Sequence, residues 1–148
     1  SCLFALAIAR SKYHAFEKHF KNIGAYYLQL YSDTSAGWKD AQKAMLDIKE
    51  LCGKNSVKLL VALQPDLHDL SKNSGQYQCH QILKEFLIKN QIPCIDLMDA
   101  YRAEGGCSHE KFWVAKDDPH SNISGHRVIF EALLPMMEDS ILKDYLHN

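Results

Sequence analysis

A carboxylate and a histidine stand three positions apart in the ten residues from Asp117 to His126, which read DDPHSNISGH. An imidazole can act as a general base when a carboxylate holds one ring nitrogen as a hydrogen-bond donor and leaves the other nitrogen free. Asp117 and His120, in a tight turn stiffened by Pro119, could supply this arrangement. The residues could equally serve the fold alone, with an aspartate capping the next helix and His120 on the surface.

The elements that must position this decamer alternate between helices and short apolar strands. Apolar residues at helical spacing predict helices over residues 6–20, 38–52, 77–89, 122–134 and 135–146, with a small helix or turn ending at residue 102. Val57 to Leu63 predicts a central strand, and Ile92 to Leu97 predicts a second, short one. Asn122 is suited to cap the helix that follows the decamer. This alternation predicts an α/β layered fold with a parallel sheet.

Length and composition favour one globular domain, or a large part of one, over residues 1–148. The chain is 47% hydrophobic and 24% charged, with 17 basic and 18 acidic residues. This balance leaves no basic stripe of the kind that binds nucleic acid. The apolar run from Cys2 to Ala9 is too short to span a bilayer, and the five scattered cysteines do not settle the compartment.

The final block resembles that of the SGNH/GDSL hydrolases, a family whose last motif is a DxxH block that often continues as HxNxxGH. The matching residues here are Asp117, His120, Asn122, Gly125 and His126. The order of predicted strands and helices upstream also resembles the second half of that family. The resemblance implies a three-layer flavodoxin-like fold and ester hydrolysis without a cofactor. By it, His120 would be the general base and Asp117, or alternatively Asp118, its orienting carboxylate.

The chain departs from that family at the nucleophile. In the family a serine in a Gly-Asp-Ser block attacks the ester, and no Gly-Asp-Ser occurs in this sequence. The nearest string, residues 32–37, is better explained as a turn before the next helix. We therefore expect a domain that is incomplete at its N-terminus and inactive alone. We also expect it to associate with a missing N-terminal segment or with itself, and to act on an acyl ester that the sequence does not identify.

Two other functions fit parts of the sequence. A zinc site is one, because potential ligands gather within twenty residues, namely Cys107, His109, Asp117, Asp118, His120 and His126. The second is a non-catalytic module that binds a glycan or a protein, using aromatic residues such as Trp38, Tyr101, Phe112 and Trp113. In the hydrolase hypothesis, Phe112 and Trp113 are the candidates for a substrate-binding wall in the predicted loop 104–116.

Overall fold

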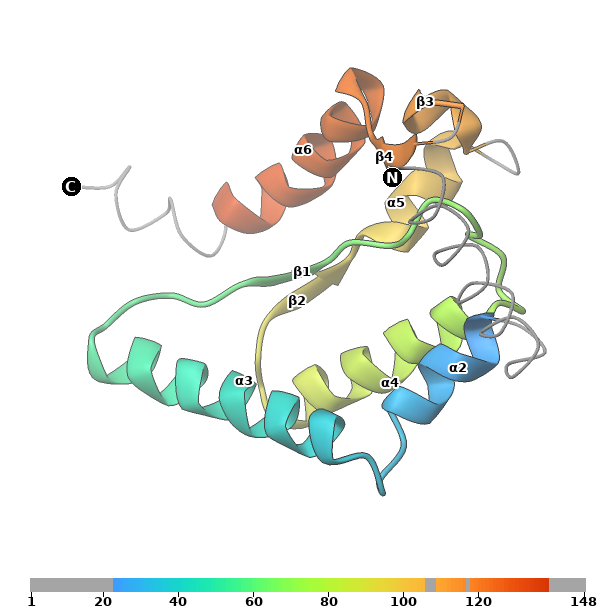
Figure 1. The fold of residues 1–148 in the computed structure, drawn as a ribbon. Coiled ribbons are helices and arrows are strands. Elements are labelled where there is room, and N and C mark those ends of the chain that lie inside the picture. Colours follow the sequence, from blue (N-terminus) through green and yellow to red (C-terminus); the bar gives the residue numbers. More distant parts are fainter. Residues whose placement is uncertain (1–22, 106–108, 117, 139–148) are drawn as a thin grey trace, which may run out of the picture.

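The computed structural model describes residues 23–105, 109–116 and 118–138, so the predicted helix over residues 6–20 lies outside the described residues. In chain order the elements are the helices α2 (Ile23–Leu30) and α3 (Ala36–Lys54), the strand β1 (Val61–Leu63), the helix α4 (Gly75–Lys89), the strand β2 (Cys94–Asp96), the helix α5 (Leu97–Gly105), the 3₁₀ helix η1 (Glu110–Phe112), the strands β3 (Trp113–Ala115) and β4 (Asp118–Ser121), and the helix α6 (Ile123–Met137) (Figure 1).

A parallel pair of strands lies at the centre of the fold. β1 and β2 run side by side in register, from Val61 opposite Cys94 to Leu63 opposite Asp96. Both predicted strands are confirmed but are shorter than the apolar runs suggested, because β1 is paired only where the short β2 lies opposite it. The mixed α/β character with a parallel pair is therefore confirmed.

One hydrophobic core joins the parallel pair to the helices on one side of it. Leu63 of β1, Leu87 of α4 and Ile92 before β2 are buried together. Trp38 of α3 is also buried and meets the ring of Phe86 at 5.6 Å between centroids. In Figure 1, α3 and α4 lie on one side of the β1–β2 ribbon and α6 lies on the other.

A second core supports the region of the decamer. Its buried side chains include Tyr101 of α5, Phe112 of η1 and Leu67 from the segment after β1, and Val128 of α6 packs with them. The Tyr101 and Phe112 rings meet edge to face at 5.2 Å. This core therefore holds α5, η1 and α6 together under the predicted catalytic residues.

Side-chain caps begin the helices where the sequence places polar residues. Asn122 accepts a hydrogen bond from the backbone N–H of Gly125 at 3.0 Å, which confirms it as the N-cap of α6. Ser35 likewise caps α3 by accepting from the backbone N–H of Trp38. The interpretation of residues 32–37 as a turn before a helix is thereby confirmed.

The helix boundary predicted at Pro135 is wrong. α6 continues through Pro135 to Met137, and the N–H of Glu138 still reaches Leu134 O and Pro135 O. Proline lacks the backbone N–H that would donate to the carbonyl four residues earlier, here that of Glu131, and the helix continues past this one missing hydrogen bond. None of the described helices is both long enough and apolar enough to cross a membrane.

Candidate functional site

The predicted catalytic turn is a short strand rather than a turn. Asp118 to Ser121 form β4, which pairs antiparallel with β3, with an irregularity in the register between Trp113 and Ala115. The expectation of a loop over residues 104–116 was also wrong, because that stretch contains the 3₁₀ helix η1 and the strand β3 that pairs with β4. Such short pairing, interrupted by an irregularity and by Pro119, leaves no period-two apolar pattern for the sequence to reveal.

Within β4, Asp118 holds His120 through two local contacts. Its Oδ1 atom accepts a hydrogen bond from the His120 backbone N–H at 3.1 Å and lies 2.5 Å from Nδ1 of the ring. The hydrogen bond from the His120 ring, followed by that from its backbone N–H, lowers the pKa of the Asp118 carboxyl below its usual value. An ionised Asp118 therefore makes Nδ1 the donor, and in the neutral form of the imidazole the lone pair then lies on Nε2.

Asp118 is therefore the carboxylate that the described geometry places on the His120 ring. Asp118 was the alternative to Asp117, and the structure joins Asp118 to His120 directly. Asp117 lies outside the described residues, so its predicted role stays a prediction. The His120 side chain is 88% exposed, which leaves the ring accessible to a ligand.

His120 lies on the wall of a cavity of about 630 Å³ that is built by two distant parts of the chain. The segment after β1 supplies one side, and β4 with the first turns of α6 supplies the other. The lining residues are Gln64, Pro65, Asp66, Leu67, His68, Pro119, His120, Ser121, His126 and Ile129. His126, which sequence reasoning assigned a structural role, is exposed and belongs to this wall.

Ser121 follows His120 directly in the chain, but none of the described hydrogen bonds joins its hydroxyl to the His120 ring. Ser121 is half-buried, and its Oγ lies 2.8 Å from the Tyr101 hydroxyl and 3.4 Å from the Gln64 side-chain nitrogen. Ser121 lines the same cavity as His120, but the described hydrogen bonds of its hydroxyl are to Tyr101 and Gln64 and not to the His120 ring. Ser121 therefore ties β4 to the core beneath it.

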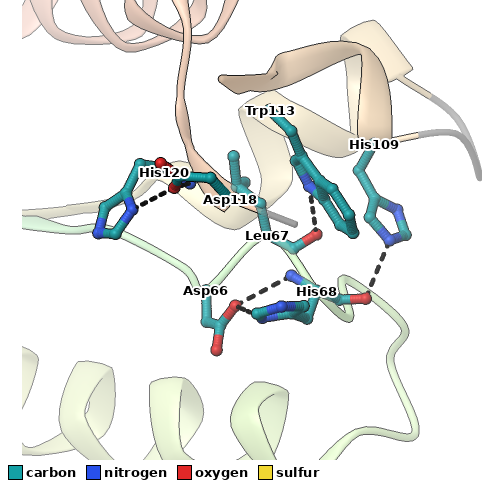
Figure 2. A network of polar contacts seen from close by, with 7 residues as sticks. All are labelled: Asp66, Leu67, His68, His109, Trp113, Asp118 and His120. Carbon is teal, nitrogen blue, oxygen red and sulfur yellow. Dashed lines mark hydrogen bonds and ion pairs between the residues drawn. The ribbon is translucent and has the colours of Figure 1, made fainter. Parts of the chain in front are cut away.

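A second aspartate and histidine on the same cavity were missed by sequence reasoning. Asp66 Oδ1 lies 2.7 Å from Nδ1 of His68 and accepts a hydrogen bond from the His68 backbone N–H at 3.0 Å. This contact repeats that of Asp118 with His120, as Figure 2 shows. The sequence does hold a signal for this second pair. Asp66-Leu67-His68 has the same Asp-X-His spacing as Asp118-Pro119-His120.

A third pair, also missed, is buried. His80 of α4 places Nδ1 2.9 Å from Asp96 Oδ1 at the end of β2, and the two side chains are only 14% and 2% exposed. Burial by itself would raise the pKa of the Asp96 carboxyl, but hydrogen bonds from His80 and from the Met98 backbone N–H outweigh it and hold the pKa below its usual value. A carboxylate at the carboxyl end of a parallel strand is the available sequence signal.

The aromatic residues proposed as a binding platform lie mostly in the core. Phe112 is 3% exposed, Trp38 6% and Tyr101 0%, so none of these three presents a ring face to a ligand. Trp113 is half-buried, and its Nε1 donates to the Leu67 carbonyl at 3.1 Å. Neither Phe112 nor Trp113 lines the cavity of His120, and their predicted contact with a substrate stays a prediction.

Among the residues that the structure describes, no three His, Cys, Asp or Glu side chains are grouped so that they could hold a metal ion. Of the suggested zinc ligands, Cys107 and Asp117 lie outside the described residues.

Comparison with protein-family models, with curated proteins and with solved structures finds no match to this chain.

Proposed function

We propose that this chain carries the acid–base half of an SGNH/GDSL-type ester hydrolase, with His120 as the general base and Asp118 as its orienting carboxylate. The observation that supports this most directly is the 2.5 Å contact between Asp118 Oδ1 and His120 Nδ1 on a ring that is 88% exposed at the wall of a cavity. The resemblance of residues 117–126 to the family's final block gives His120 its chemical context, and the DxxH spacing of that block keeps Asp117 as the alternative partner.

In this proposal Nε2 of His120 removes the proton from an attacking hydroxyl, and the imidazolium that forms is stabilised by the ionised Asp118. The proton then passes to the oxygen of the departing alcohol when the acyl carbon–oxygen bond breaks. The attacking serine of the family is not assigned to a residue of this sequence. Ser35 caps α3, and Ser121 is bonded to Tyr101.

The test is ester hydrolysis by the protein as its gene encodes it, with p-nitrophenyl acetate as the probe. We expect His120→Ala to lower kcat/KM by about 10³-fold or more. Asp118→Asn should lower it by a similar factor, because an amide N–H that donates to Nδ1 favours the tautomer whose Nε2 already carries a proton. His126→Ala, on the same cavity wall, is the matched control and is expected to change the rate no more than a few-fold.

Residues 1–148 alone are expected to show negligible turnover. Turnover by these residues that disappears in His120→Ala would place the nucleophile among them and contradict a divided active site. Full activity of His120→Ala, or no hydrolysis by the gene-encoded protein, would overturn the hydrolase proposal and favour the binding module.

A further inference from the structure

Two Asp-X-His segments from distant parts of the chain adopt the same local geometry. In each, one aspartate oxygen meets both the backbone N–H and the ring Nδ1 of the histidine two residues later. His68 follows β1, whereas His120 lies in β4. Because both histidines and Asp66 line one cavity, the fold brings two carboxylate-oriented imidazoles to a single site.

The segment that carries His68 is held in place from outside by the β3 region. The Trp113 indole N–H donates to the Leu67 carbonyl at 3.1 Å, and His109 Nε2 lies 3.1 Å from the His68 carbonyl oxygen. The Trp113 ring also meets the His68 ring, with 5.5 Å between centroids (Figure 2). Both the backbone and the ring of His68 are therefore fixed before any ligand arrives, as a binding group requires.

Fold stability does not account for the Asp66–His68 pair. The His68 side chain is 58% exposed and that of Asp66 is 43% exposed. Contacts between charged groups at such exposure contribute little to folding, because water screens them and competes for their hydrogen bonds. An exposed ring that is nevertheless held in one orientation is better explained by a ligand that contacts its free nitrogen.

The cavity lining indicates the chemistry of that ligand. With Nδ1–H directed to a carboxylate, Nε2 of a neutral imidazole accepts a hydrogen bond, and a hydroxyl group is the simplest donor. The carboxylate of Asp66 lines the cavity, and its described lining contains no lysine or arginine to attract an anion. Pro119 and Ile129 supply an apolar part of the wall.

We infer that His68, oriented by Asp66, is a second ligand-binding residue of this cavity, and that the ligand is a neutral ester of a polyhydroxy alcohol. The ester group lies beside His120, and a free hydroxyl of the alcohol donates to Nε2 of His68. Only the position of the ester rests on the proposed function, because binding through His68 can be measured without turnover.

The experiment is a nuclear magnetic resonance titration of the histidine ring signals with glycerol monoacetate. We expect the His68 and His120 signals to shift together and to saturate with one Kd. Propyl acetate, which lacks the free hydroxyls, should bind several-fold more weakly, and acetate ion should leave both signals in place. His68→Ala should weaken glycerol monoacetate binding about 3- to 10-fold, as expected for one hydrogen bond.

His126→Ala is again the matched control, because His126 lines the same cavity and, among the described contacts, has no aspartate on its ring. It should change the affinity less than His68→Ala does. The inference is overturned if glycerol monoacetate shifts neither ring or only that of His120, or if His68→Ala binds it as the wild type does. Binding through His68 without any ester hydrolysis would instead overturn the proposed function alone.

Discussion

The pairs His120–Asp118 and His80–Asp96 use the same atoms in opposite surroundings. Each joins Nδ1 of a histidine to Oδ1 of an aspartate, at 2.5 Å and 2.9 Å respectively. The His120 and Asp118 side chains are 88% and 44% exposed, whereas those of His80 and Asp96 are 14% and 2% exposed. The hydrogen bond alone therefore does not distinguish a structural pair from a pair that presents a ring to a ligand.

The difference lies in what each pair connects. Asp118 and His120 are two residues apart in one strand, so their contact fixes the orientation of the His120 ring but joins no two elements of the fold. His80 and Asp96 are 16 residues apart, and their contact joins α4 to the junction of β2 and α5. Asp96 also accepts the Met98 backbone N–H at 3.0 Å. The buried pair thus stabilises the fold, and the exposed pair presents a ring at little cost to it.

The largest effect that would test this contrast is the loss of stability in Asp96→Ala. The substitution leaves the buried Met98 N–H and the mostly buried His80 ring without their acceptor, and we expect a decrease of about 2 to 4 kcal/mol in the free energy of unfolding. Urea denaturation measures it. Asp118→Ala is the matched control and should lower the midpoint much less, because water screens the exposed pair. Equal destabilisation by the two substitutions would show that the contrast is wrong.

A smaller effect is expected in acid. The pKa of Asp96 is lowered in the folded protein, so its contribution to stability is present above the pKa of the unfolded state, about 3.9. The contribution is lost as the pH falls through the lower folded pKa. An asparagine side chain at this position does not titrate. We therefore expect the stability difference between the wild type and Asp96→Asn to shrink as the pH decreases from about 5 to below 4.

Urea denaturation at several pH values would measure this difference. Because other carboxyls with lowered pKa values, such as Asp69 and Asp118, are present in both proteins, their contributions cancel. A difference that is constant with pH would mean that the ionised form of Asp96 contributes nothing to the fold.

The sequence predicted what depends on local pattern. The helical periodicity over residues 38–52 and 77–89 found α3 and α4, and the polar Asn122 before an apolar stripe found the start of α6. His120 was predicted as an exposed or working residue from its motif, and Asp118 was kept as an alternative partner. These features are set by neighbours within a few residues, which a pattern of side chains records.

What the sequence could not provide is the meeting of distant segments. His68 joins the cavity of His120 only because the segment after β1 meets β4, and His80 meets Asp96 only because α4 packs on β2. The β3–β4 hairpin was missed because its pairing is too short and too irregular for alternation to appear. Hydrophobic periodicity carries no information on which side chains of different elements come within hydrogen-bond distance.

The smallest expected effect is that of Tyr101→Phe, which removes hydrogen bonds beneath the exposed Asp118–His120 pair and leaves the pair itself intact. The Tyr101 hydroxyl lies 2.8 Å from Ser121 Oγ and donates to the Gly125 carbonyl at 3.2 Å, which ties β4 and α6 to the core. Tyr101→Phe should lower the free energy of unfolding by about 1 kcal/mol, because these bonds are lost in a buried site. Ser121→Ala removes only one of them and should cost less.

The ring of His120 should nevertheless stay oriented in Tyr101→Phe, because both contacts that orient it come from Asp118. The ¹⁵N signals of the ring would report this, with Nδ1 remaining the protonated nitrogen. Asp118→Ala should do the reverse, releasing the ring with little change in stability. A His120 ring that loses its orientation in Tyr101→Phe would mean that the exposed pair depends on the core, as the buried pair does.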